Sequence, residues 1–287
     1  RFFVNKEAIG DDEIAIVGSD AHHIARSLRM AEGDGLTVCD GSGIEYDCTL
    51  TRIRDEECIC KIQSSLAEGA TAFGIQLCKI KKELRTKENL TKIFEACEGL
   101  PIYVTSYRHS ENEGFTDEQC VEVLLLAIES GATIVDIMGD MYDRGSKWEL
   151  TENPEAIAKQ KALIEKIHAM GGEVLMSSHT SSNLTVEETL KVAKAHEERG
   201  ADVVKIVNRV DALEDLPKSF ETIIELNKTV SKKLLYLESG PTQKLVRNLG
   251  PQLGVCMYLT CQYYGPMDTL GQPKLTRLKK VIEGLDY

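Results

Sequence analysis

The chain has 287 residues, which is more than one domain usually needs, since domains run to about 100–200 residues. Hydrophobic residues make up 42% of it, but no apolar run approaches the ~20 residues of a membrane span and no signal-peptide pattern opens the sequence. We therefore expect a soluble, cytoplasmic protein with no membrane partner. The net charge of −12 disfavours nonspecific nucleic-acid binding and is compatible with a small anionic substrate held at a locally positive site.

Residues 1–68 have the pattern of a small β-rich domain. Short apolar runs alternate with turn residues, and Asp40-Gly41-Ser42-Gly43 between two such runs is typical of a hairpin. One helix is expected over His22–Met30. The predicted strands are Arg1–Val4, Glu13–Val17, Gly35–Cys39, Glu45–Ile53 and Glu57–Gln63.

Over residues 69–287 the pattern changes to strand-like runs that alternate with amphipathic helices. This alternation predicts an α/β fold with a parallel sheet wrapped by helices, a (β/α)8 barrel of the TIM type. The first of its eight strands is uncertain, and Cys58–Ser64 is the candidate for it. The other predicted strands are Ala72–Ile80, Pro101–Arg108, Thr133–Asp140, Glu173–His179, Val203–Arg209, Lys233–Ser239 and Val255–Cys261. The helices between them include Lys87–Cys97, Asp117–Ser130, Pro154–Met170, Val186–Arg199 and Phe220–Val230.

Lys205 lies in the middle of an apolar strand, in V-V-K-I-V-N. A lysine buried there must be neutral or paired with an opposite charge. A neutral amine is the species that attacks a ketone to form a Schiff base. The alternative is a lysine at a strand edge that faces solvent. The apolar neighbours on both sides favour the Schiff-base interpretation.

His179 ends the preceding predicted strand, in L-M-S-S-H-T-S. Catalytic groups of parallel barrels lie at the C-terminal ends of the strands, so His179 and Lys205 are expected at the same mouth. Histidine exchanges protons near neutral pH, which makes His179 the candidate acid/base group, although a lone histidine after a strand is more often an ordinary loop residue. Glu111 or Glu113, which follow Arg108, could supply the carboxylate that orients it.

Four segments resemble the type I 3-dehydroquinate dehydratases in order and spacing. They are P-I-Y-V-T-S-Y-R-H-S-E-N-E-G over Pro101–Gly114, then M-S-S-H, K-I-V and G-P-T-Q-K-L-V-R. The resemblance covers roughly Ala70–Leu285. It implies a lyase of the shikimate pathway, which makes aromatic amino acids. Such an enzyme eliminates water from 3-dehydroquinate through an imine intermediate.

The resemblance also assigns roles to residues. Lys205 would form the imine, and His179, held by Glu113, would remove the α-proton and protonate the leaving hydroxyl. Arg247 would be the main clamp for the substrate carboxylate, because a guanidinium binds a carboxylate through two hydrogen bonds. Gln272, in G-Q-P-K, would close over a small anionic keto acid. The predicted substrate-binding residues are Arg108, Arg247, Gln272 and Gln76.

Four positions depart from the family pattern, and one of them is Asp268, which stands where the family has a loop serine. Gln76 and Cys78 stand where the family has an E-x-R pair that contacts substrate hydroxyls, and Gly139 stands where a glutamate is expected. The imine chemistry is thus expected to be retained while the contacts that recognise the substrate differ. An imine-forming aldolase, or a dehydratase of another keto acid, is therefore a second hypothesis.

The N-terminal segment resembles a different family. R-F-F-V and then G-S-D-A-H-H-I-A-R-S-L-R-M-A-E-G-D-G-L-T-V-C-D-G-S-G-I-E-Y resemble the PUA-like first domain of ribosomal-RNA uridine-N3 methyltransferases. The resemblance implies an RNA-facing helix that contains His22, His23, Arg26 and Arg29. However, residues 1–68 contain 7 Lys and Arg against 14 Asp and Glu, a net charge of −7, which disfavours RNA as a partner. A non-catalytic barrel that carries an RNA-binding module is the third hypothesis.

Cofactors and metals are not expected. No glycine-rich phosphate-binding motif occurs, and Cys58 and Cys60 form a tight pair without a second pair or a histidine at zinc spacing. The chain is expected to form a homodimer.

Overall fold

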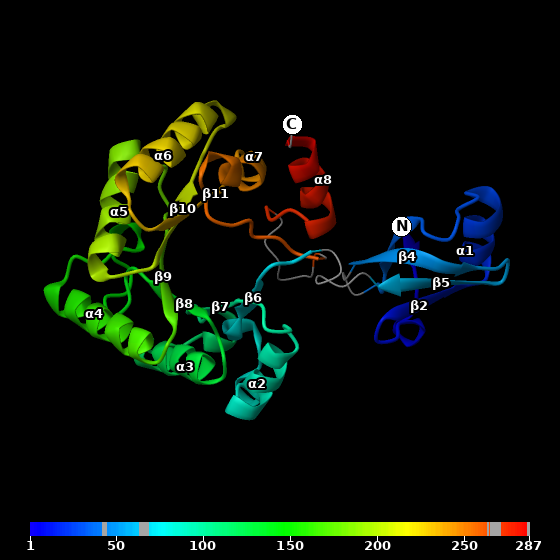
Figure 1. The fold of residues 1–287 in the computed structure, drawn as a ribbon, viewed down its shortest axis with the longest axis horizontal. Coiled ribbons are helices and arrows are strands. Elements are labelled where there is room, and N and C mark those ends of the chain that lie inside the picture. Colours follow the sequence, from blue (N-terminus) through cyan, green and yellow to red (C-terminus); the bar gives the residue numbers. More distant parts are fainter. Residues whose placement is uncertain (42–44, 63–68, 263, 265–270, 286–287) are drawn as a thin grey trace. The chain divides into compact units, whose positions relative to one another are not determined.

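The computed structural model describes residues 1–41, 45–62, 69–262, 264 and 271–285. The chain divides into two compact units, drawn in Figure 1. The first unit comprises Arg1–Ala70 together with Thr260–Tyr287, and the second comprises Thr71–Leu259. Among the described residues, no helix is both long enough and apolar enough to cross a membrane.

The first unit contains a five-stranded sheet in the order β1-β3-β4-β5-β2. Its strands confirm the predicted runs, and the expected helix begins earlier, as α1 (Ser19–His22) followed by a π-helical turn over His23–Ser27. α8 (Leu275–Leu285) also belongs to this unit. The strands are β1 (Phe2–Phe3), β2 (Glu13–Val17), β3 (Gly35–Cys39), β4 (Glu45–Ile53) and β5 (Glu57–Ile62).

The prediction that Cys58–Ser64 supplies the first barrel strand is wrong. β5 covers the described part of that segment and pairs antiparallel with both β2 and β4. Alternating side chains of β5 enter the core of the first unit, where Cys58 and Cys60 are fully buried. An apolar alternation identifies a strand, but it does not say which sheet the strand joins. Residues 63–68, at the expected domain boundary, lie outside the described residues.

The second unit contains a parallel sheet in the order β11-β10-β9-β8-β7-β6. Figure 1 shows this sheet curling, with helices α2 to α6 along its outer side. The arrangement confirms the predicted α/β fold of the TIM type, with six strands in the described residues. They are β6 (Phe73–Gln76), β7 (Ile102–Thr105), β8 (Ile134–Met138), β9 (Glu173–His179), β10 (Val203–Arg209) and β11 (Lys233–Ser239).

The strand predicted over Val255–Cys261 does not form. Cys256 donates one backbone hydrogen bond to Leu234 of β11, at 2.7 Å, and the only other pairing described in this segment is an isolated bridge of Cys261 to Lys274. Cys256 is exposed and the residues after it are only half-buried, whereas β8 is buried along its whole length. An apolar segment forms a strand only where a neighbouring strand hydrogen-bonds along its length, so an apolar composition alone is not sufficient.

The helices follow the capping signals in the sequence. Thr116 and Gln119 bond each other's backbone N–H at the start of α3, and Thr185 and Glu188 form the same kind of capping box at the start of α5. Gly200 ends α5 in the left-handed conformation, at a φ of 103°. The helices of the second unit are α2 (Lys87–Glu95), α3 (Asp117–Glu129), α4 (Pro154–Ala169), α5 (Val186–Arg199), α6 (Leu216–Thr229) and α7 (Gln243–Leu249).

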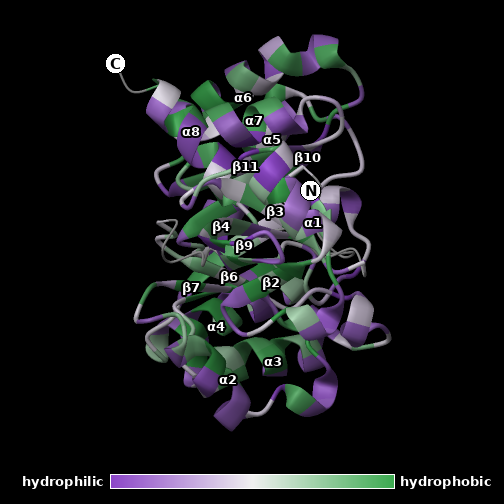
Figure 2. Ribbon diagram, turned by 90° about the vertical axis from the view of Figure 1, so that its right-hand side faces the viewer, coloured by the Kyte–Doolittle hydropathy of each residue, from purple (hydrophilic) through white to green (hydrophobic). Residues whose placement is uncertain are grey.

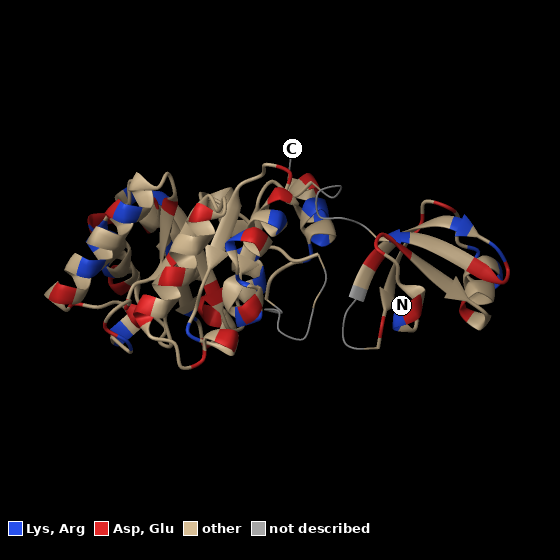
Figure 3. Ribbon diagram, turned by 90° about the horizontal axis from the view of Figure 1, so that it is seen from below, with Lys and Arg blue, Asp and Glu red and all other residues tan. Residues whose placement is uncertain are grey.

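The helices of the second unit are amphipathic. Helices α2, α3 and α6 carry hydrophobic and hydrophilic residues side by side (Figure 2), and their apolar side chains pack against the buried strands. Charged residues lie mainly on the helices and loops of this unit (Figure 3). The buried charged residues of the strands are therefore exceptions, and they mark the candidate site.

Candidate active site

Lys205 lies in β10 with its amine inside a cluster of polar groups. Its Nζ is 2.6 Å from the Tyr107 hydroxyl, 3.1 Å from the Tyr103 hydroxyl and 3.0 Å from Asp136 Oδ2. Lys205 is 4% exposed and Asp136 is 1% exposed. The amine is therefore paired with a carboxylate, which is one of the two states expected for a lysine buried in an apolar strand.

The strand register brings this cluster together. Asp136 lies two residues after the partner of Tyr103, and Ser177 lies two residues after the partner of Asp136. Ser177 is in turn the register partner of Lys205. Side chains two residues apart in a strand point to the same side of the sheet, so four adjacent strands contribute one side chain each to the cluster.

Asp136 carries the negative charge of the cluster. Its Oδ2 accepts hydrogen bonds from Tyr103, Tyr107 and Lys205, and its Oδ1 accepts one from Ser177. Burial raises the pKa of Asp136, but the charge of Lys205 and these hydrogen bonds outweigh it and hold the pKa below its usual value. Burial and the Asp136 charge raise the pKa values of Tyr103 and Tyr107. The carboxyl group is therefore ionised and both phenols keep their protons.

His179 ends β9 beside this cluster. Its ring meets the Tyr107 ring edge-on, with centroids 5.2 Å apart and an interplanar angle of 85°. Its Nδ1 is 2.8 Å from Glu149 Oε2, which also accepts a hydrogen bond from the His179 backbone N–H. His179 and Lys205 thus share Tyr107 as a neighbour, as expected for two groups at one barrel mouth.

The structure pairs His179 with Glu149, whereas the sequence predicted Glu113. Glu113 is exposed and follows a short 3-10 turn over Ser110–Asn112. That turn directs Asn112 into the interior, where its side chain bonds Arg85, so the following glutamate faces outward. The conformation of this loop thus decides which of its polar residues points inward, and Glu113 is not the one that does.

Glu149 could not be found from a motif, since W-E-L matches none. It lies in a loop after β8, at the end of a 3-10 turn over Lys147–Glu149. Both Trp148 and Glu149 have positive φ, of 62° and 52°, a conformation that residues other than glycine rarely adopt. Backbone strain of this kind is often found at functional sites, and here it accompanies the placement of the carboxylate on His179.

Gly139 explains how this loop is accommodated. A Cβ there would lie 2.5 Å from the Glu149 carbonyl oxygen, 2.9 Å from Ser178 Oγ and 3.0 Å from His196 Nε2. His196 is fully buried, and burial with the nearby Arg199 charge lowers its pKa to about 3, so the ring is neutral at ordinary pH. The glutamate that the family pattern places at this position has no room here.

We expect Gly139→Ala to destabilise the protein by about 1–3 kcal/mol, because the added methyl group overpacks the contact between β8 and the Glu149 loop. Urea denaturation measures the change. Gly74→Ala is the matched control, since its Cβ would meet only Tyr103 Cδ1, at 3.6 Å. Equal effects of the two substitutions would mean that the space beside Gly139 is not restricting.

Arg108 is already held by two carboxylates. Its guanidinium bonds Asp117 at 2.7 and 3.0 Å and Asp140 at 2.6 Å. Burial lowers the pKa of Arg108, but these bonds outweigh it and the net pKa is raised. The arginine thus anchors the segment after β7 to α3 and to the end of β8, in place of the free substrate contact that was expected.

Arg247, in α7, is 7% exposed. Its Nη2 donates to the Glu238 carbonyl at 3.3 Å, and its Nε is buried with no hydrogen-bond partner in the described part of the chain. Burial lowers the pKa of Arg247. Unlike Arg108, Arg247 therefore has an N–H group that could donate a hydrogen bond to a ligand.

The other predicted binding residues are more scattered. Gln76 is half-buried at the end of β6, and Cys78 is fully buried in the turn that follows, where burial raises its thiol pKa. Gln272 belongs to the first unit, where its carbonyl accepts a hydrogen bond from Tyr264 at 2.6 Å. Gln76 makes no described contact with Lys205.

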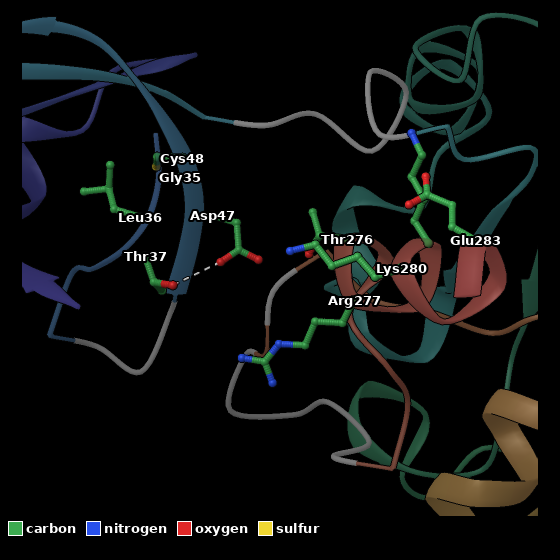
Figure 4. Close-up of a pocket in the computed structure, with 10 residues that line it drawn as sticks. Gly35, Leu36, Thr37, Asp47, Cys48, Thr276, Arg277, Lys280 and Glu283 are labelled. Atoms are coloured by element: carbon green, nitrogen blue, oxygen red, sulfur yellow. Dashed lines mark hydrogen bonds between the residues drawn. The ribbon is translucent and has the colours of Figure 1, made fainter. Parts of the chain in front are cut away.

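Two surface hollows are described, and neither contains Lys205 or His179. One, of about 580 Å³, lies in the first unit between β3–β4 residues and α8 (Figure 4). Thr37 donates to Asp47 there at 3.2 Å, opposite Arg277 and Lys280. The other, of about 400 Å³, lies at the start of α3. The described residues include no group of three His, Cys, Asp or Glu side chains that could hold a metal ion.

Two family models match the chain. The type I 3-dehydroquinase model matches residues 49–285, and the RNA methyltransferase PUA domain model matches residues 16–63. No curated protein matches.

Solved 3-dehydroquinate dehydratases have a similar fold. The Geobacillus kaustophilus HTA426 enzyme is 16% identical, with a TM-score of 0.58 over 71% of this chain and 76% of that one. The type I enzyme from Clostridium difficile, solved with covalently modified comenic acid, is 16% identical, with a TM-score of 0.60 over 76% and 82%. The Enterococcus faecalis enzyme is 14% identical, with a TM-score of 0.51 over 75% and 93%.

Proposed function

The chain belongs to the type I 3-dehydroquinase family and is therefore a carbon–oxygen lyase, and from this premise we propose that it converts 3-dehydroquinate to 3-dehydroshikimate through an imine on Lys205. The single observation that carries the proposal is the buried amine of Lys205, held beside His179 through Tyr107. An amine, an ionised carboxylate and a histidine paired with a carboxylate are the groups that imine-based elimination requires.

In the proposed reaction, the Lys205 amine condenses with the substrate ketone and releases one water molecule. The positively charged imine withdraws electrons from the neighbouring carbon, so that His179 can remove a proton from it. The electron pair then expels the β-hydroxyl, which takes a proton from His179 and leaves as water. Hydrolysis of the imine releases the product. Glu149 stabilises the charge that His179 gains in the first transfer.

Substrate binding is proposed to centre on Arg247. Its unpaired Nε suits one oxygen of a carboxylate, and the group is desolvated, which strengthens a charge-assisted hydrogen bond. Gln76 would add a hydrogen bond to a hydroxyl group. Arg108 is less available, because Asp117 and Asp140 already neutralise it.

A second candidate substrate is another hydroxy-keto acid. Three observations favour it: Arg108 is paired, Cys78 is buried and uncharged, and Gly139 has no space for a carboxylate. All three remove polar groups that the family pattern places around the substrate, and none of them replaces a side chain of the Lys205 cluster. A changed substrate with the same imine chemistry is consistent with that pattern.

The test is borohydride reduction in the presence of each candidate ketone, followed by peptide mass spectrometry and a dehydratase assay. A reduced adduct on Lys205 with 3-dehydroquinate, together with efficient release of 3-dehydroshikimate, supports the main proposal. An adduct with another keto acid and slow turnover of 3-dehydroquinate supports the second. If no ketone gives an adduct on Lys205, both are wrong.

RNA is a further candidate partner only because of the PUA match over residues 16–63. In the structure Arg26 is in an exposed ion pair with Asp55, which offsets the positive charge that an RNA contact would use. We expect no salt-sensitive binding of structured ribosomal RNA in fluorescence anisotropy at low salt. Affinity that falls when Arg26 and Arg29 are both replaced by glutamine would contradict this expectation.

A further inference from the structure

Tyr107 has no part in the reaction described above, yet its hydroxyl touches the reacting amine. It is 2.6 Å from Lys205 Nζ, the shortest of the contacts of that amine, and 2.7 Å from Asp136 Oδ2. Its ring edge lies against His179. One phenol thus contacts the nucleophile, the buried carboxylate and the acid/base histidine.

A lysine in an ion pair cannot attack a carbonyl, because its nitrogen has no free electron pair while it carries three protons. One proton must leave before the bond forms, and a proton must later reach the oxygen that departs as water. Tyr107 can accept a hydrogen bond from Lys205 while it donates one to Asp136. A proton can therefore pass from the amine to the phenol oxygen as the phenol proton passes to Asp136.

We propose that Tyr107 is a second catalytic acid/base residue, which works with Asp136 on the imine step and leaves His179 and Glu149 for the elimination. The inference rests on the proposed function of Lys205. It divides the proton transfers between two systems, one centred on the Lys205 amine and one on the His179 ring.

The protons balance through the whole step. The relay first yields a neutral amine and a protonated Asp136. The amine attacks the carbonyl carbon, a C–N bond forms, and one amine proton moves to the oxygen, which gives a carbinolamine. Asp136 then returns its proton through Tyr107 to the hydroxyl group. The C–O bond breaks, water leaves, and a protonated imine remains beside an ionised Asp136. No oxidant or other reagent is needed.

Tyr107 is better placed for this role than Tyr103. The Tyr103 hydroxyl is farther from the amine, at 3.1 Å, and Tyr103 is the more buried of the two. Tyr107 is only partly buried, and its ring lies against that of His179. Burial and the Asp136 charge both raise the pKa of Tyr107, so the phenol holds its proton until the relay operates.

The experiment compares two rates in single-turnover conditions. Rapid mixing with 3-dehydroquinate and quenching with borohydride gives the rate of imine formation on Lys205, and solvent deuterium incorporation gives the rate of α-proton exchange. Tyr107→Phe is expected to slow imine formation by about 100-fold, at the lower end of typical acid–base contributions. His179→Ala is expected to leave imine formation within about threefold and to abolish exchange.

Tyr258→Phe is the matched control, because it removes a phenol oxygen that bonds only Gln252 in the described structure. It should change neither rate. Thermal unfolding of each variant identifies a folding defect, and in that event Tyr107→Trp, which also lacks the hydroxyl, repeats the test.

Imine formation at the unmodified rate in Tyr107→Phe overturns the assignment of Tyr107 and leaves the proposed function standing. Loss of imine formation in His179→Ala also overturns it, since one histidine would then serve both steps. No adduct on Lys205 in the unmodified protein overturns the proposed function and this inference together.

Discussion

Replacement of Lys205 by methionine is expected to abolish dehydratase turnover, by about 10⁴-fold or more, because the proposed reaction passes through an imine on its amine. Methionine keeps the length of the side chain and removes only the amine. Turnover is measured by the ultraviolet absorbance of the enone product, and the borohydride adduct on residue 205 should disappear in parallel. Residual turnover within tenfold of the unmodified protein would show that the reaction does not pass through Lys205.

The same substitution is expected to lower stability, because it leaves Asp136 buried without its cation. Removal of one partner of a buried ion pair costs about 3–5 kcal/mol. The double variant Lys205→Met with Asp136→Asn should recover much of that loss while it remains inactive. It is therefore the control that separates a folding defect from a catalytic one.

The stability difference between the unmodified protein and Lys205→Met should depend on pH, and the protonation of Asp136 sets the direction of the change. In the unmodified protein the pKa of Asp136 is lowered, so the stability it contributes is present above the unfolded-state pKa and is lost as the pH falls through the folded-state pKa. Without Lys205 the Asp136 carboxyl is easier to protonate. The free-energy cost of burying it without a cation therefore falls as the pH falls. The gap between the two proteins should thus narrow as the pH is lowered from 7 to 4. A gap that widens would show that Asp136 is not the source of the cost.

The second large effect is expected at His179. His179→Ala should lower kcat by about 10³-fold, within the range of 10²–10⁴ typical for a general acid/base group. Glu149→Gln should lower kcat by about 10²-fold with KM changed less than about threefold, because Glu149 contacts the histidine through hydrogen bonds and acts by positioning it. Steady-state kinetics measure both.

Glu113→Gln is the matched control for Glu149→Gln. The two substitutions are chemically identical, but Glu113 is exposed and makes no described contact with His179. Only Glu149→Gln is expected to reduce kcat. The reverse result, with Glu113→Gln inactive and Glu149→Gln active, would favour the sequence-based assignment over the contact seen in the structure.

The sequence was sufficient to identify candidate residues that can be recognised from their position within a single strand. Lys205 could be predicted because a charged residue among apolar strand neighbours is costly unless it has a function or a partner. His179 could be predicted because it ends the strand before it. The alternation of strands and helices likewise indicated the parallel sheet, and the threonine caps marked the starts of α3 and α5.

Only the tertiary structure decided which carboxylates serve these two residues. Asp136 reaches Lys205 because strand register places side chains of four strands on one side of the sheet, at separations in sequence of tens of residues. Glu149 reaches His179 because a loop with two positive φ angles crosses a glycine. Register and loop strain arise from packing between distant segments, and local sequence patterns do not contain that information.

The strands show the same difference between what the sequence predicts and what the tertiary structure decides. The type of each strand could be predicted from its composition, but the partners of Cys58–Ser64 and Val255–Cys261 could not. The described part of the first segment joined the small antiparallel sheet, and the second formed no ladder. A strand is stable only where a neighbour satisfies its backbone hydrogen bonds, and that neighbour is chosen by the folded chain. The sequence by itself thus determined the class of fold and the two side chains proposed to react, and the tertiary structure determined their partners.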